Sequence, residues 1–157
     1  MRLDWSKAFP PARDALSGVE AAVRESGLEP TLLELVRLRA SQLNGCAYCV
    51  DMHAKDARAR GESEGRLHLV AVWREAECFS ARERAALAWC EAVTLVAQSH
   101  VPDAAFEEAR RAFDERELVA LTLAIVAING WNRMSVAFRP PVGGYVSPYG
   151  TADGGGR

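Results

Sequence analysis

The chain of 157 residues lacks any segment in which polar and apolar residues alternate with a period of two. It also lacks clusters of Val, Ile and Thr bounded by turn residues. Both patterns are typical of strands, so their absence argues against a β-sheet. Strong charge is missing too, because the formal net charge is only −2. We therefore expect an all-α protein that has neither nucleic acid nor an anionic membrane as a partner.

Long apolar runs are also absent. The longest, Leu118–Ile128, is interrupted only by Thr122 and is too short to span a membrane, so it fits a buried core helix. The first residues, Met1–Trp5, lack the apolar stretch of a secretory signal. We therefore expect a cytoplasmic protein, in a compartment that keeps thiols reduced. There, a Cys-x-x-Cys pair is more often redox-active or metal-binding than a permanent disulfide.

Residues that start and stop helices divide the chain into about seven predicted helices. Pro, Ser or Asp residues stand at most of the starts, and Gly or Pro residues at several of the ends. The length and the lack of a composition break favour a single all-helical domain over residues 1–142. The segment 143–157 is rich in glycine and is predicted to be a flexible tail. The predicted helices cover residues 12–26, 30–43, 46–60, 64–77, 81–98, 101–113 and 115–138.

The predicted helix 115–138 is apolar on every side as far as Ile128. Such a helix must be covered on every side, and a small helical domain rarely surrounds one helix completely. Burial in a subunit interface would cover the remaining side. We therefore expect a homo-oligomer.

The segment Cys46-Ala47-Tyr48-Cys49-Val50-Asp51-Met52-His53 carries the strongest chemical signal. Positions three and four residues apart share one face of a helix, so both sulfurs and the imidazole would point to one side. A break at Asn44-Gly45 places both cysteines in the first turn, where unpaired N–H groups favour thiolates. His53 can accept or return a proton. Either sulfur could attack a peroxide and form a sulfenic acid, which the other would resolve as a disulfide.

Glu34 lies on the preceding predicted helix, within Leu32-Leu33-Glu34-Leu35-Val36. A carboxylate among apolar residues can be drawn into a partly buried site. The turn at Asn44-Gly45 folds the two helices into a hairpin that could bring Glu34 near His53, where it would orient the imidazole. The alternative is a surface residue paired with Arg37.

Glu34, the pair Cys46-x-x-Cys49 and His53 together resemble the signature of the alkylhydroperoxidase D group, in the carboxymuconolactone decarboxylase-like superfamily. The resemblance is strong over residues 32–60 and looser through to Arg133. It implies an all-helical fold that assembles into homotrimers or homohexamers. It also implies peroxidase or disulfide-reductase activity without a metal, haem or other cofactor. The decarboxylase members generally lack the cysteine pair.

By this resemblance, Cys49 would attack a hydroperoxide and Cys46 would resolve the sulfenic acid, while Glu34 and His53 form the proton relay. An external thiol or dithiol would then restore the dithiol. The best-known members carry a second histidine between the cysteines, where this chain has Tyr48. A tyrosine keeps a hydrogen-bond donor in that place but is no base at neutral pH. Its alternative role is packing at a helix contact.

Two other functions fit the same residues. One is the reduction of disulfides in a partner protein, with peroxide only a poor substrate. The replacement of histidine by Tyr48 favours this function. The other is a zinc-stabilised structural module, in which Cys46, Cys49 and His53 supply three ligands. Candidates for its fourth ligand are Glu34, Cys78 and Cys90. Cys90 is better explained as a core thiol, because it shares a stripe with Ala86, Val93 and Ala97.

Overall fold

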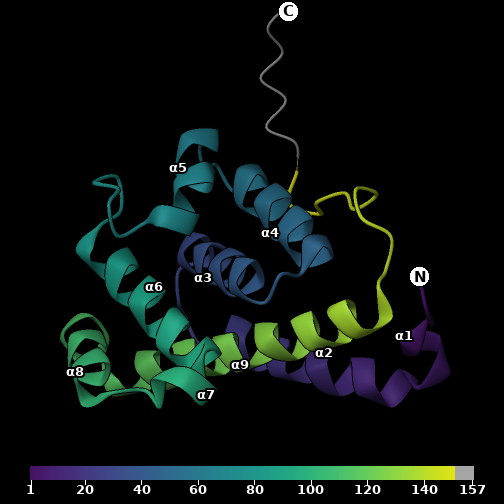
Figure 1. The fold of residues 1–157 in the computed structure, drawn as a ribbon, viewed down its shortest axis with the longest axis horizontal. Helices are drawn as coiled ribbons and strands as arrows, with labels where there is room; N and C mark the ends of the chain where they lie inside the picture. Colours follow the sequence, from purple (N-terminus) through teal and green to yellow (C-terminus); the bar gives the residue numbers. More distant parts are fainter. Residues whose placement is uncertain (151–157) are drawn as a thin grey trace, which may run out of the picture.

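The helix α3 (Pro30–Leu43) lies at the centre of the molecule, as the computed structural model of residues 1–150 shows (Figure 1). It packs against α4 (Ala47–Ala59), α6 (Ala81–Thr94) and α9 (Glu115–Phe138). Nine of its fourteen residues are buried, Glu34 and Arg37 among them. A carboxylate and a guanidinium on this helix are therefore held inside the protein.

Residues 1–150 contain nine α-helices, one 3-10 turn and no strand, which confirms the all-α prediction. Single-turn helices account for part of the difference from the seven predicted helices. In place of the predicted helix 64–77 the structure has a shorter α-helix that ends at Leu69 and continues as a 3-10 helix of three residues. Leu67 of the first and Val70 of the second are buried. The remaining elements are α1 (Trp5–Ala8), α2 (Pro10–Arg24), α5 (Glu64–Leu69), η1 (Val70–Val72), α7 (Val96–Ser99) and α8 (Asp103–Ala112).

A tight turn at Asn44 and Gly45, followed by Cys46, joins α3 to α4 at the motif. The N–H of Gly45 donates to the carbonyl of Gln42 at 3.2 Å, and the N–H of Cys46 donates to the carbonyl of Ser41 at 3.0 Å. These two bonds form a Schellman motif, for which Gly45 adopts the left-handed conformation at φ +65°. Cys46 is also the N-cap of α4, because its Sγ accepts from the N–H of Cys49 at 3.3 Å. The predicted position of the cysteine pair at a helix N-terminus is confirmed.

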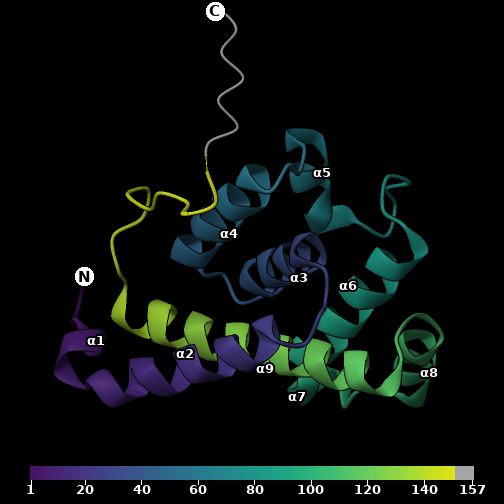
Figure 2. The same ribbon diagram turned by 180° about the vertical axis from the view of Figure 1, so that it is seen from behind.

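The helix α9 runs alongside α2 and also contacts α3, α4, α6 and α8 (Figure 2). Its length and composition would allow it to cross a membrane, yet one face is part of the protein core, with Leu121 and Ile125 fully buried. The single chain leaves part of this helix uncovered, so burial of its remaining side in a subunit interface stays a prediction. On the outer face, Val119 is 70% exposed and Val126 is 54% exposed.

Residues 139–150 turn back from the end of α9 and run beside α4 (Figures 1 and 2). The Nζ atom of Lys55 donates to the carbonyl oxygens of Gly143, at 3.0 Å, and Tyr145, at 3.1 Å. This segment therefore forms a wall next to the helix that carries His53. The flexible tail at 143–157 stays a prediction, and its residues 151–157 lie outside the described part of the chain.

Candidate functional site

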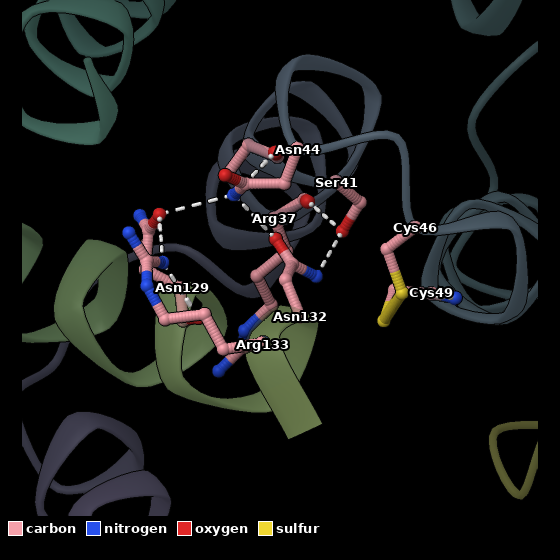
Figure 3. Close-up of a disulfide and its surroundings, with 9 residues drawn as sticks. Arg37, Ser41, Asn44, Cys46, Cys49, Asn129, Asn132 and Arg133 are labelled. Carbon is pink, nitrogen blue, oxygen red and sulfur yellow. Dashed lines mark hydrogen bonds between the residues drawn. A yellow bond between two sulfur atoms is a disulfide. The ribbon is translucent and has the colours of Figure 1, made fainter. Parts of the chain in front are cut away.

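Cys46 and Cys49 are joined by a disulfide, with their Cα atoms 5.3 Å apart (Figure 3). Both residues are only 2% exposed. The i, i+3 spacing at the start of α4 brings the two sulfurs together without any rearrangement of the helix. The motif therefore supplies a dithiol–disulfide pair within a single helical turn.

Glu34 and His53 are in direct contact, as the hairpin between α3 and α4 led us to expect. The distance between Glu34 Oε2 and His53 Nδ1 is 2.9 Å. Glu34 is 2% exposed and His53 is 6% exposed. Arg37 NH1 donates to Glu34 Oε1 at 3.0 Å, so the alternative pairing with Arg37 is also present, but inside the protein and not at its surface.

A line of alternating charges supports the imidazole. Arg37 bridges Glu34 to Glu20 of α2, since its NH2 atom lies 2.6 Å from Glu20 Oε2. Arg60 Nε lies 3.9 Å from Glu34 Oε1. Burial alone would raise the pKa of Glu34, but the hydrogen bond and charge of His53, with the charges of Arg37 and Arg60, hold that pKa below its ordinary value. The carboxylate is therefore the stable form of Glu34.

Asp56 and Tyr145 belong to the same site, although neither was predicted as a site residue. The Tyr145 hydroxyl donates to Asp56 Oδ1 at 2.9 Å, and Asp56 is buried. Burial, followed by this bond to the Asp56 carboxylate, raises the pKa of Tyr145 above its ordinary range. Asp56 lies three residues after His53, so the helical period could have placed it on the same face. No local signal connects Tyr145 to α4.

A cavity of about 680 Å³ opens beside the Glu34–His53 pair. Among the described residues, three buried side-chain nitrogens have no hydrogen-bond partner, and all three belong to residues that line this cavity. They are Arg37 Nε, His53 Nε2 and Arg60 Nε. Aromatic and apolar side chains complete the wall, including Met52, Trp131, Tyr145 and Tyr149. The two arginine nitrogens are donors, and a buried donor without a partner is costly, so the site is suited to a ligand that carries oxygen acceptors.

Tyr48 lies between two cavities. It lines the cavity beside Glu34 and also a second one of about 360 Å³, which Cys46 lines as well. Neither cysteine lines the cavity beside Glu34. The position of Tyr48 in the motif thus separates the imidazole side of the site from the disulfide side.

The described residues do not form the zinc site considered above. In residues 1–150, the one group of three or more candidate ligands within reach of a single ion is Glu34, His53 and Asp56, which contains no cysteine. Cys78 is exposed, whereas Cys90 is fully buried in the core, as predicted. Burial raises the pKa of Cys90 to about 12, so this thiol is inert near neutral pH.

A buried polar network fixes the turn that precedes the cysteines (Figure 3). Asn44 Nδ2 donates to Asn132 Oδ1 at 2.8 Å and to Asn129 Oδ1 at 3.0 Å. Asn132 Nδ2 in turn donates to Ser41 Oγ at 3.1 Å. The end of α9 therefore holds the last turn of α3, and through it the position of Cys46.

The fold and this site define an all-α protein in which a buried carboxylate–imidazole pair lies one helical turn from a Cys-x-x-Cys disulfide. Residues 8–92 match the model of the carboxymuconolactone decarboxylase family. The chain belongs to that family.

Two relatives are similar over most of their length. YdfG of Bacillus subtilis, an uncharacterized protein, is 38% identical over 87% of this chain and 92% of its own. The crystal structure of ATU0492 from Agrobacterium tumefaciens, a protein of unknown function for which an antioxidant-defence role as AhpD has been suggested, superimposes with a TM-score of 0.88. That match has 46% identity and covers 90% of this chain and 97% of the other.

The alkyl hydroperoxide reductase AhpD of Acidobacterium capsulatum is 42% identical over 57 residues, which are 36% of this chain and 29% of that protein. These similarities confirm the resemblance to the alkylhydroperoxidase D group within the family. Because the family also includes decarboxylases, membership alone does not define a reaction.

Proposed function

We propose that this protein is a thiol-dependent peroxidase-like oxidoreductase that reduces hydroperoxides through Cys46 and Cys49. One observation carries the proposal: the cysteine pair lies one helical turn before His53, whose Nδ1 atom is 2.9 Å from a buried carboxylate oxygen of Glu34. A dithiol next to an oriented proton carrier is what the reaction requires.

The cycle starts from the dithiol. The Cys49 thiolate attacks one peroxide oxygen, the O–O bond breaks, and the alkoxide leaves with a proton from the His53 relay. The products are an alcohol and a sulfenic acid on Cys49. The Cys46 thiolate then attacks the sulfenic sulfur and releases water. This step gives the Cys46–Cys49 disulfide, and an external thiol or dithiol donates two electrons and two protons to restore the dithiol.

Glu34 sets the orientation and the tautomer of His53 in this scheme. As a carboxylate it accepts a hydrogen bond from Nδ1, which leaves Nε2 free to take or return a proton. The unpartnered nitrogens of Arg37 and Arg60 supply positive charge on the same side of the site. Such charge would stabilise the oxyanion that develops as the O–O bond breaks. Tyr48 is proposed to line the route between the imidazole and the sulfurs.

The central test is a count of free thiols before and after addition of one equivalent of hydroperoxide to the reduced protein. We expect the loss of two thiols and a disulfide between Cys46 and Cys49. Cys49→Ser should abolish turnover with a thiol donor, while Cys78→Ser, which changes an exposed cysteine outside the motif, should leave it unchanged. Unchanged thiols, or stoichiometric zinc in the purified protein, would contradict the proposal.

A second candidate function is the reduction of disulfides in a partner protein. It is favoured by Tyr48, which offers no base between the cysteines, and by the position of Cys46 on a cavity of its own. A Cys49→Ser variant should then trap a mixed disulfide between Cys46 and the partner. A variant that traps no partner and a wild-type protein that turns over hydroperoxide would favour the peroxidase.

We further propose a homotrimer or homohexamer in the cytoplasm. The support is an apolar groove between α8 and α9, next to the exposed Val119 and Val126. Light scattering coupled to gel filtration measures the assembly, and Val126→Lys should shift it toward the monomer because a buried charge disrupts an apolar interface. A monomeric wild-type protein would contradict this part of the proposal. The groove is lined by Trp89, Phe106, Arg110, Glu115, Leu118, Val119, Thr122, Leu123 and Val126.

A further inference from the structure

The disulfide side of the site has a cavity of its own. It holds about 360 Å³ between the start of α4, the end of α9 and the residues that follow. Cys46 lines it, whereas Cys49 lines no cavity described for residues 1–150. Tyr48 is the one residue that it shares with the cavity beside Glu34. A molecule bound here would meet Cys46 and not Cys49.

The charge of this cavity is distinctive. Its lining consists of small, apolar and uncharged polar residues, together with one cation, Arg139. No acidic residue lines it, and Arg139 forms no ion pair with any residue in the described part of the chain. Arg139 is the C-cap of α9 and holds the left-handed conformation at φ +53°, which a non-glycine residue rarely adopts. An exposed, unpaired guanidinium is suited to a carboxylate.

We propose that this cavity binds the reductant, and that the reductant is a small thiol that carries a carboxylate. This inference rests on the proposed function only for the step in which an external thiol reduces the Cys46–Cys49 disulfide. The donor thiolate attacks the sulfur of Cys46, the disulfide bond breaks, and Cys49 leaves as a thiolate. A second donor thiolate then attacks the donor sulfur of the mixed disulfide. It releases the Cys46 thiolate and the oxidised donor, and the two cysteines take up two protons.

Two features of the structure favour attack on Cys46 and departure of Cys49. Cys46 is the sulfur that the cavity reaches. Cys49 lies in the first turn of α4, where the helix N-terminus stabilises a developing thiolate, and one turn before His53. The reductant would therefore reach the disulfide through the cavity that Cys46 lines, and not through the cavity beside Glu34.

The charge of the donor provides the first test. Reduction of the disulfide in the oxidised protein is followed by alkylation and mass measurement, without peroxide, with thioglycolate as the anionic donor and cysteamine as the cationic donor. Arg139→Glu should lower the ratio of the thioglycolate rate to the cysteamine rate by about five-fold or more at low salt, and less at high salt. Arg116→Glu is the matched control, since it makes the same change of charge at the exposed far end of α9. An unchanged ratio in Arg139→Glu, or an equal change in Arg116→Glu, would overturn the proposal.

The site of attack provides the second test. Oxidised wild-type protein is mixed briefly with thioglycolate and quenched with iodoacetamide, and its peptides are mapped. We expect the donor on Cys46 and the alkyl group on Cys49, and the reverse labelling would overturn the assignment. Since no peroxide is used, these results stand even if the protein does not reduce hydroperoxides. Conversely, a working peroxidase with no charge preference would refute only the reductant site.

Discussion

The Oε2 atom of Glu34 and the Nδ1 atom of His53 lie 2.9 Å apart, although nineteen residues separate them in the chain. The contact spans two helices joined by a turn of two residues, Asn44 and Gly45, and it is almost completely buried. A buried hydrogen bond to a carboxylate is directional and strong, so it fixes the tautomer of the imidazole.

Removal of this carboxylate should impair chemistry more than binding. In Glu34→Gln the side chain keeps its shape but loses the charged oxygen that pairs with His53 Nδ1. We expect the rate of dithiol oxidation by hydroperoxide to fall on the order of 100-fold or more, measured by stopped-flow fluorescence. Glu29→Gln is the control, because Glu29 pairs with Arg82 away from the site. Equal rates in Glu34→Gln and the wild type would remove Glu34 from the relay.

The same carboxylate should make stability depend on pH. The folded-state pKa of Glu34 lies below its ordinary value of 4.5, so the folded state favours the ionised form. Its contribution is therefore fully present above about pH 4.5 and is lost as the pH falls through the lower, folded-state pKa. We expect the difference in unfolding free energy between wild type and Glu34→Gln to shrink in that acid range, measured by urea unfolding. A difference that grows on acidification would contradict the assignment.

The left-handed turn at Gly45 should be sensitive to a single methyl group. An added Cβ meets no atom within 4 Å there, so the effect of Gly45→Ala arises from backbone strain at φ +65° alone. We expect a destabilisation of about 1 kcal/mol. Gly65→Ala is the matched control, because Gly65 lies within α5 and also has open space around it. That change should stabilise the protein by a few tenths of a kcal/mol to about 1 kcal/mol.

The link between α9 and the cysteine turn depends on Asn132. Its side chain accepts from Asn44 at 2.8 Å and donates to Ser41 at 3.1 Å, and the residue is fully buried. Asn132→Ala removes one acceptor of the Asn44 amide and the donor to Ser41 Oγ, so we expect a loss of about 1–3 kcal/mol in unfolding free energy. Hydrogen exchange at residues 44–46 should also become faster. Exchange that stays at the wild-type rate would show that the network does not hold the turn.

The hydroxyl of Tyr145 should help to hold the segment after α9 to α4, in addition to the two hydrogen bonds from Lys55. Tyr145→Phe removes the donor to the buried Asp56 carboxylate, and we expect faster proteolysis and hydrogen exchange over residues 139–150. The matched control is Tyr149→Phe, because the Tyr149 ring stacks on Arg60 at 3.5 Å and that contact does not need the hydroxyl. Similar behaviour of the two variants would show that the hydroxyl of Tyr145 is not the tether.

Much of the site can be predicted because its signals are local. The spacing of Cys46, Cys49 and His53 places them on one helical face whatever surrounds the helix. Asn44-Gly45 predicts the break that turns Cys46 into an N-cap. The number of residues between Glu34 and this break determines which residues of the two helices lie opposite each other. It therefore also determines the contact between Glu34 and His53.

Other parts depend on pairings that no local pattern contains. Tyr145 reaches Asp56 across 89 residues, and Asn132 reaches Asn44 across 88. The sequence predicts that Arg37 can pair with Glu34. It does not predict that both side chains are buried, or that Arg37 also pairs with Glu20 of another helix. These pairings result from burial, because a polar side chain inside the protein must form a hydrogen bond with a group that the packing places next to it.

The sequence by itself determined the helical class, the cysteine pair at a helix N-terminus and the pairing of Glu34 with His53, because each follows from helix periodicity or from one tight turn. Only the tertiary structure decided that Tyr48 separates two cavities, that Cys46 faces one of them, and that Arg139 lines the same one without an ion-pair partner among residues 1–150. Cavities form where helices distant in the chain fail to fill the space between them, and no local pattern encodes such a space.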